Sequence, residues 1–396
     1  MADILKKDQF VLPDGVVYLD GNSLGPMPKG VPERMHAMLT EEWAQMLIGG
    51  WNKAGWMAMP EAVGNKVGRL IGAAPGSVVM GDTLSIKVYQ ALAAGVKLRP
   101  DRRVILSDTG NFPSDLYIAE GLVGLLGQGY ELRTVAPEDV AEAIGEDVAV
   151  VMLTEVDYRT GRKHDMKTIT EMAHAAGAVM VWDLAHSAGA LPVDLAGANC
   201  EFAVGCTYKY LNSGPGGPAF IYVRPDLADT VEPALAGWLG HARPFDFDLT
   251  YTPGAGIERM RVGTPPVLQL AALDVSMELW ADVDMKALRA ASVALQERFI
   301  AGVEAAAPEL VLASPRDAHI RGSQVSFRFD HGYAAMQALI ARGVVGDFRA
   351  PDIMRFGFTP LYIDNDDVDH AVEVIADVMN NALWDADEYK VRARVT

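Results

Sequence analysis

A lysine, an aspartate and a histidine lie at or just after the ends of two apolar segments and could act together on one cofactor. Asp183 ends the segment "VMVWD", His186 follows in "LAHS", and Lys209 stands in "TYKYLNSGPGG", just after another apolar run. A lysine amine can form a Schiff base with an aldehyde, and a carboxylate can keep a pyridine nitrogen protonated. Each residue also has a structural alternative: Asp183 could cap a helix, and Lys209 could be a solvated charge.

Two further stretches suit other parts of a cofactor that carries a phosphate and a flat ring. "GDTLSIKV" passes from a strand end into a helix, with Thr83 and Ser85 near the helix start. Helix N-termini offer free N–H groups and a positive dipole, which favour a phosphate. "TGNFPSD" places Phe112 in a proline turn, where its ring could stack on the cofactor. A capping hydroxyl and a phenylalanine packed in a loop are the structural alternatives.

The segments that must position these residues alternate between strand and helix from about residue 60 to 225. Strands are expected at 77–82, 103–108, 148–156, 178–187, 202–210 and 219–223, and helices at 61–73, 85–98, 118–126 and 167–177. This alternation predicts a largely parallel sheet covered on both faces, with ligands at the carboxyl ends of its strands. Polar residues stand at several of those ends: Asp82-Thr83, Ser107-Asp108, Asp183 and Tyr208-Lys209.

The pattern changes after about residue 268. Helices are expected at 267–283, 285–306, 333–343 and 367–383, and strands at 323–329 and 344–349. Helices and strands on this smaller scale predict a second, α+β domain, which the first 40 or so residues would join. The predicted division is a large domain, 45–267, and a small domain made of 1–44 and 268–396.

Composition narrows the classes of protein to consider. The chain has 396 residues, half of them hydrophobic, and 52 acidic against 34 basic residues give a net charge of −18. Such an acidic chain, without a basic stripe, is a poor candidate for binding nucleic acid or an anionic membrane. Two cysteines, Cys200 and Cys206, fit a reduced compartment. No apolar run is long enough for a signal peptide or a membrane span, so a cytoplasmic protein is expected.

Three stretches resemble the kynureninase family, pyridoxal 5′-phosphate enzymes of the fold-type I, class V aminotransferase superfamily. They are "YLDGNSLGP" at 18–26, "WDLAHSAG" at 182–189 and "YKYLNSGPGGPAF" at 208–220. Supporting stretches are "WNKAGW", "NFPSD", "VGTPP" and "MRFGFTPLY". The likeness covers almost the whole chain and is to the bacterial form. It implies an α/β, fold-type I large domain with a mainly parallel seven-stranded sheet, and a smaller α+β domain.

The resemblance also implies roles for individual residues. Lys209 would be the Schiff-base lysine, and Arg355 would bind the substrate α-carboxylate. Tyr208 would bond the cofactor phosphate and is expected to carry protons, with a purely structural role as the open alternative. Trp56 is interpreted as a wall of the aryl pocket. A core position is the open alternative for Trp56. No metal is implied. The residues implied to contact the cofactor are Leu84, Ser85, Phe112, Pro113, Ser114, Asp115, Thr154, Asp183, His186, Tyr208, Lys209, Trp238 and Thr264.

The implied activity is hydrolysis of the Cβ–Cγ bond of L-kynurenine to anthranilate and L-alanine, through an aldimine of Lys209. The 3-hydroxy form of kynurenine is a second possible substrate. The resemblance leaves open whether the reaction serves tryptophan catabolism or NAD biosynthesis. It further implies a homodimer with shared active sites, in which Trp238 and Thr264 reach the cofactor of the partner subunit.

Three other readings of the sequence remain. A cysteine desulfurase or selenocysteine lyase would need a mobile thiol in the C-terminal half, and the stretch 207–396 has no cysteine. An amino-acid epimerase of the same superfamily branch would not explain "YLDGNSLGP". A binding module that has lost catalysis would be expected to lack Lys209 or Asp183, and both are present.

Overall fold

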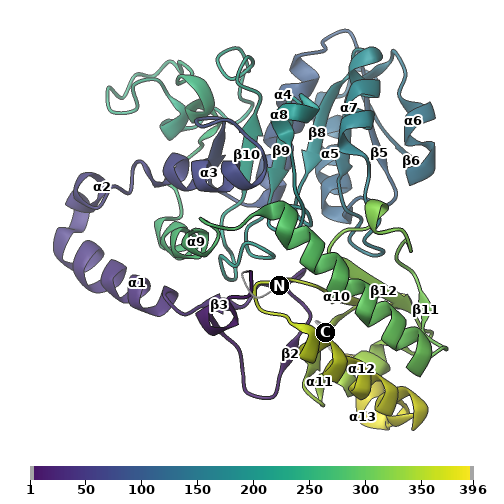
Figure 1. Ribbon diagram of the computed structural model, residues 1–396. Helices are drawn as coiled ribbons and strands as arrows, with labels where there is room; N and C mark the ends of the chain where they lie inside the picture. The colour runs from purple at the N-terminus through teal and green to yellow at the C-terminus, as the bar shows by residue number, and fades with distance from the viewer. Residues whose placement is uncertain (1–3, 393–396) are drawn as a thin grey trace.

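A seven-stranded sheet forms the centre of the larger part of the molecule (Figure 1). In the computed structural model, which describes residues 4–392, the strand order is β4-β10-β9-β8-β7-β5-β6. Neighbours from β9 to β6 are parallel, whereas β10 runs antiparallel to both β9 and β4. The predicted mainly parallel sheet is confirmed. The strands are β4 Val78–Met80, β5 Val104–Asp108, β6 Glu131–Val135, β7 Val148–Thr154, β8 Val179–Asp183, β9 Phe202–Gly205 and β10 Phe220–Val223.

Helices cover both faces of this sheet, as the apolar strand sequences require. Every residue of β8 is buried, and its side chains alternate between two cores. Val179 and Val181 join the core beneath α4, while Met180 and Trp182 join the core on the opposite face. The covering helices are α3 Met59–Leu70, α4 Leu84–Lys97, α5 Pro113–Leu126, α6 Val140–Ala143, α7 Met166–Ala175 and α8 Leu195–Ala198.

A second, antiparallel sheet has the order β11-β12-β15-β14 and lies with α10, α11 and α12 below the large sheet in Figure 1. The strand expected at 344–349 is divided at Gly346, where an added Cβ would lie 2.7 Å from the Arg355 carbonyl oxygen. Its first half, β13, pairs instead with β2 near the N-terminus. The elements are β2 Val17–Tyr18, α10 Met285–Ala306, β11 Val311–Leu312, β12 Gln324–Arg328, α11 Gly332–Ile340, β13 Val344–Val345, β14 Asp347–Arg349, β15 Ile353–Gly357, α12 Asn365–Asn380 and α13 Asp387–Lys390.

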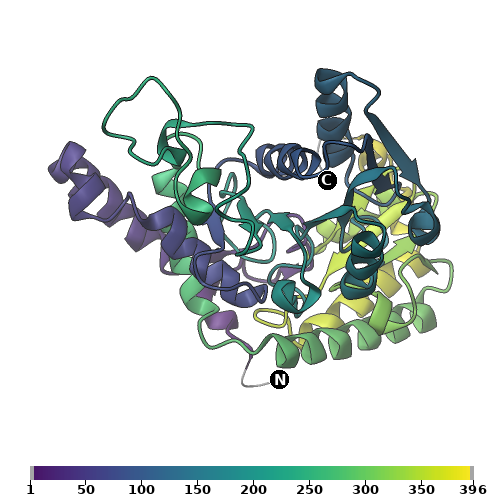
Figure 2. The same ribbon diagram turned by 90° about the horizontal axis from the view of Figure 1, so that it is seen from above.

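The segment that follows β3 projects from the body. In Figures 1 and 2, α1 and the helical turns after it extend away from both sheets, and a loop-rich stretch after β10 projects on the same side. Trp43 and Ile48 in this segment are 57% and 82% exposed. The elements of this segment are α1 Val31–Ala37, the π-helix η2 Met38–Met46 and α2 Gly50–Lys53. It is preceded by β1 Phe10–Val11 and β3 Met27–Pro28, and α9 Val267–Leu279 packs against α1 and α3.

Short 3-10 helices complete the list of elements: η1 Lys7–Gln9, η3 Leu47–Gly49, η4 Pro137–Asp139, η5 Trp238–Gly240, η6 Gly256–Met260, η7 Ala318–Ile320 and η8 Leu383–Asp385. Across residues 4–392, no helix has the length and apolar character needed to cross a membrane. The ends of the predicted small domain, residues 1–3 and 393–396, lie outside the described residues.

Candidate active site

A cavity of about 360 Å³ lies at the carboxyl ends of the parallel strands, where the large sheet meets β14 and β15. It brings together most of the residues that the sequence singled out, from segments far apart in the chain. Its lining consists of Asn22, Ser23, Thr83, Leu84, Ser85, Phe112, Ser114, Thr154, Tyr158, Asp183, Ala185, His186, Tyr208, Lys209, Arg349 and Arg355. This position at strand ends is the one expected for a ligand site in an open α/β sheet.

Lys209 faces this cavity from the turn that follows β9. The turn is held by a backbone hydrogen bond from Asn212 to the Lys209 carbonyl and by a left-handed Asn212, at φ 58°. The Lys209 Nζ lies 3.1 Å from Nε2 of His186 and 5.9 Å from the centre of the Phe112 ring. The amine is therefore half-buried among site residues, which excludes the reading of Lys209 as an ordinary solvated charge.

Asp183 and Asp115 form a buried carboxyl pair beside Lys209. Asp183 ends β8, the neighbour of β9, and its Oδ1 accepts a 2.9 Å hydrogen bond from the Ala185 N–H. Burial raises the pKa of Asp183 to about 6, against the lowering effect of the Lys209 amine. Burial, and then the charge of Asp183, raise the pKa of Asp115 well above its usual range. Two carboxyl groups so placed favour a bound cation such as a protonated ring nitrogen.

Two helix N-termini converge on the same cavity. At the start of α4, Thr83 is extended and its side chain makes no capping hydrogen bond. The "proline turn" expected at Phe112 is in fact the start of α5, because proline fits the first helical position, where no N–H is needed. The hydroxyls of Ser85 and Ser114 lie 3.2 Å apart between the two helix starts. Free N–H groups, two helix dipoles and two hydroxyls suit a phosphate.

His186 supplies a neutral ring to the cavity wall. Burial lowers its pKa well below the usual value, and the Lys209 charge adds to this effect. Its Nδ1 is buried without a hydrogen-bond partner among the described residues. A buried polar atom left unpaired is costly, so its presence here indicates that a polar ligand completes the site. The Thr154 hydroxyl, in the same wall, donates a hydrogen bond to the Val156 carbonyl.

Several lining residues were not singled out from the sequence. Arg349 and Tyr158 carry no local pattern that would have marked them, and Ala185 lies within the quoted "WDLAHSAG" stretch without an assigned role. Asn22 and Ser23 lie within the quoted "YLDGNSLGP" stretch, which reaches the cavity because the N-terminal segment folds back against the turn after Lys209. The stretch was informative, although no role had been assigned to these two residues.

Five predicted residues do not line the cavity within one chain. Pro113 begins α5, and Asp115 lies behind the lining, against Asp183. Trp56 is buried in a small separate core, where its ring meets Trp51 edge-to-face. Its indole N–H donates a 2.7 Å hydrogen bond to a Glu42 carboxylate oxygen, and its assignment to the aryl pocket stays a prediction.

Trp238 and Thr264 lie on the surface of the described chain. Trp238 is 46% exposed and meets Phe245 edge-to-face. Thr264 is exposed in the loop before α9. Their assignment to the partner subunit's cofactor stays a prediction.

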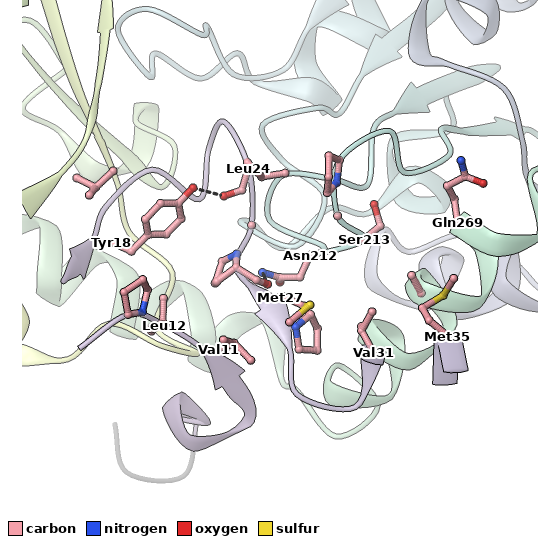
Figure 3. Close-up of a pocket in the computed structure, with 18 of the residues that line it drawn as sticks. Val11, Leu12, Tyr18, Leu24, Met27, Val31, Met35, Asn212, Ser213 and Gln269 are labelled. Carbon is pink, nitrogen blue, oxygen red and sulfur yellow. Dashed lines mark hydrogen bonds between the residues drawn. The ribbon is translucent and has the colours of Figure 1, made fainter. Parts of the chain in front are cut away.

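A larger cavity of about 630 Å³ adjoins the N-terminal segment (Figure 3). Its lining contains apolar and neutral polar side chains from residues 11–35, from the turn at 212–215, from α9 and from Val345 of β13, and no charged residue. Figure 3 shows Tyr18 hydrogen-bonded to the Leu24 carbonyl at one end and Met35 with Gln269 at the other. This lining offers no amine, carboxylate, imidazole or guanidinium for the chemistry described above, so the smaller, charged cavity is the candidate active site.

No group of metal-ligating side chains is found within residues 4–392. The two cysteines, Cys200 and Cys206, are buried and free, and burial raises the pKa of both thiols. They are therefore poor nucleophiles.

Comparison with known proteins gives consistent results. Residues 288–375 match the family described as "Kynureninase C-terminal domain". Kynureninase from Pseudomonas fluorescens is 49% identical over 98% of this chain and 95% of its own length, and that from Burkholderia pseudomallei is 48% identical with the same coverage.

Solved structures agree on the fold. A cysteine desulfurase from Thermococcus onnurineus has a TM-score of 0.80 at 20% identity, covering 96% of this chain and 98% of its own. The cystine C-S lyase C-DES, with glycine linked covalently to its PLP cofactor, has a TM-score of 0.81 at 18% identity, covering 94% and 99%.

Proposed function

The chain belongs to the kynureninase family, and from that premise we propose how its residues carry out the reaction. The activity is hydrolysis of the Cβ–Cγ bond of kynurenine to anthranilate and L-alanine, with pyridoxal 5′-phosphate as cofactor. The desulfurase alternative is not favoured, because the likeness to desulfurases is in fold alone and both thiols are buried. The observation that carries the proposal is the half-buried Lys209 amine beside Asp183 and His186 in one cavity.

The site residues fit pyridoxal phosphate. The starts of α4 and α5, with the Ser85 and Ser114 hydroxyls, would take the phosphate, and Phe112 would lie against the ring. Asp183, backed by Asp115, would hold the ring nitrogen protonated. When bound, the cofactor supplies an electron-withdrawing ring and an aldehyde carbon that reacts with amines.

Proton transfer falls to two residues of the turn after β9. Lys209 would be the base that removes the α-proton of the bound substrate. Its amine lies 3.1 Å from Nε2 of His186, which is kept neutral by burial and so can orient the amine without repelling it. The neighbouring Cys206 and burial raise the pKa of Tyr208, so its phenol stays protonated near neutral pH and can serve as a donor.

Arg355 is the proposed partner of the substrate α-carboxylate. It is buried on β15, and its side chain lines the cavity that contains Lys209. A guanidinium offers paired donors in a plane that matches a carboxylate. The substrate amine and α-carbon would thereby be held next to Lys209.

The test is direct. Purified protein loaded with pyridoxal phosphate should release fluorescent anthranilate and L-alanine in equal amounts from L-kynurenine. The 3-hydroxy substrate, run in parallel, would decide the preference. No anthranilate from a fully loaded enzyme would refute the activity, and sulfide or alanine formed from cysteine instead would favour a desulfurase.

We also propose that the protein is a cytoplasmic homodimer with shared active sites. Each chain would consist of a large domain, 45–267, and a small domain made of 1–44 and 268–396. Support for a dimer comes from the exposed Trp238 and Thr264, the apolar cavity of Figure 3 and the exposed Trp43 and Ile48. Lys209→Ala and Trp238→Ala homodimers should each be impaired, yet regain activity on mixing, because a hybrid contains one intact site. An active monomer, or no recovery after subunit exchange, would refute sharing.

A further inference from the structure

Three charged side chains of the smaller sheet lie on one face of that sheet. Asp347 and Arg349 stand two residues apart on β14, and Asp347 is the direct cross-strand partner of Arg355 on β15. Since side chains alternate along a strand and cross-strand partners share a face, all three point to the same side. Arg349 and Arg355 both line the active-site cavity.

One oxygen of Asp347 joins the two guanidinium groups. Its Oδ2 lies 2.6 Å from Nη2 of Arg355 and 2.7 Å from Nη2 of Arg349. The same oxygen accepts a 2.6 Å hydrogen bond from the hydroxyl of Ser23, which also lines the cavity. Asp347 and Arg355 are buried, whereas the Arg349 side chain is 36% exposed. Without the carboxylate, two like charges in a poorly solvated wall would repel each other.

An unpaired donor and the balance of charge in this cluster favour the binding of one more carboxylate. Nε of Arg355 is buried and has no hydrogen-bond partner among the described residues, so it is a free donor. Asp20 lies near Asp347, and burial together with the Asp347 charge raises the pKa of Asp20 to about 7. At a lower pH Asp20 is neutral, and two guanidiniums then face a single carboxylate. One added carboxylate balances the charge.

We propose that Asp347 is a positioning residue that holds Arg355 and Arg349 together as a two-cation subsite for the substrate α-carboxylate. The inference rests on the proposed function, because it takes the substrate to be an amino acid. Asp347 itself does not touch the substrate. It fixes the two guanidiniums side by side, so that Arg355 binds the carboxylate from the buried wall and Arg349 from the more exposed side.

The test compares substrates with and without the carboxylate. For the loaded enzyme, kcat and KM would be measured with L-kynurenine, and a dissociation constant with its amine analogue, in which hydrogen replaces the α-carboxylate. Asp347→Asn and Arg349→Gln should raise KM about tenfold or more, with a much smaller change in kcat. Arg349→Lys should recover part of the loss, because it keeps the charge. Affinity for the amine analogue should not change.

Glu201→Gln is the matched control. Glu201 is also a buried, ion-paired carboxylate, bound to Arg224 and His174, but it lies before the start of β9, at the end of the strand away from the cavity. This variant should keep wild-type KM and kcat. Thermal unfolding and cofactor absorbance would verify that each variant folds. If Asp347→Asn does not fold, the two substitutions of the half-exposed Arg349 carry the test.

The outcomes separate this inference from the proposed function. Unchanged KM in Asp347→Asn and Arg349→Gln, or an equal loss of affinity for the analogue without a carboxylate, would overturn the inference while kynurenine cleavage stands. A wild-type enzyme that releases no anthranilate would overturn the proposed function. The subsite would then be tested by the dissociation constants of L-kynurenine and of its amine analogue. Weaker binding of L-kynurenine alone would support the subsite, and equal weakening of both would refute it.

Discussion

Substitution of Gly25, in the "YLDGNSLGP" stretch, should lower activity, because this glycine touches the backbone of the catalytic turn. Its N–H donates a 2.8 Å hydrogen bond to the Tyr208 carbonyl. A Cβ added at residue 25 would lie 2.3 Å from the Lys209 carbonyl oxygen and 2.4 Å from Nδ2 of Asn212. Real Cβ contacts are essentially never under 3.0 Å, so Gly25→Ala must move the segments around Gly25 and Lys209 apart by about 0.7 Å.

The expected cost can be worked from these contacts. Overpacking a filled site costs about 1–3 kcal/mol, and weakening the buried Gly25 hydrogen bond adds about 1 kcal/mol, so we expect a loss of about 3 kcal/mol in the free energy of unfolding. Since a displacement of about 1 Å at a reacting group can lower the rate about 100-fold, kcat should fall tenfold or more for Lys209 chemistry.

Urea unfolding and anthranilate release measure the two effects of Gly25→Ala separately. Gly121→Ala is the control, because Gly121 lies exposed within α5 and its Cβ would meet nothing within 4 Å. That substitution should leave kcat unchanged and stabilise the protein by about 0.5–1 kcal/mol, through helix propensity. If Gly25→Ala retained wild-type stability and kcat, the close approach of the two segments would be wrong.

Three further predictions concern the site itself. Lys209→Ala should abolish turnover while the far-UV circular dichroism spectrum stays native, and substantial activity in that variant would rule out the assignment. Arg355→Ala should raise KM by about 100-fold while cofactor affinity changes little, since a charged hydrogen-bond pair with substrate is lost; equal effects on both would contradict the carboxylate role. The cofactor-free protein should lose stability as pH rises from about 4 to about 6, because burial raises the pKa of Asp183 from 3.8 to about 6 and the native state then binds more protons than the unfolded state. Asp183→Asn should reduce that slope, and identical pH profiles by urea unfolding would refute the shifted pKa.

Much of the fold could be predicted because hydrophobic periodicity is a local property. The long helix expected at 285–306 is α10 with the same bounds, and the apolar run at 148–156 contains β7. The prediction failed at 344–349, where Gly346 divides one expected strand between two sheets. It also missed β6, whose mixed polar sequence "ELRTV" and exposed positions are typical of an edge strand and carry little apolar pattern.

The candidate site could be predicted where a residue's chemistry was tied to a strand end or to a family-like stretch. Asp183 and Lys209 meet because β8 and β9 are parallel neighbours, which the alternation of strands and helices had favoured. Arg349 could not be found in this way, because its placement depends on the register between β14 and β15. Register is set by packing between strands and leaves no mark on the local sequence.

The sequence by itself determined the kinds of groups available: an amine, a buried carboxyl at a strand end, a helix start for an anion, and the order of the elements that carry them. Only the tertiary structure decided that Asp115 lies against Asp183, that Gly25 touches the turn of Lys209, and that Asp347 joins two arginines. The physical reason is the distance along the chain over which each effect acts. Periodicity and helix capping act over a few neighbouring residues, whereas these contacts join segments distant in the chain or in different strands, whose approach is set by how the two sheets and their helices pack.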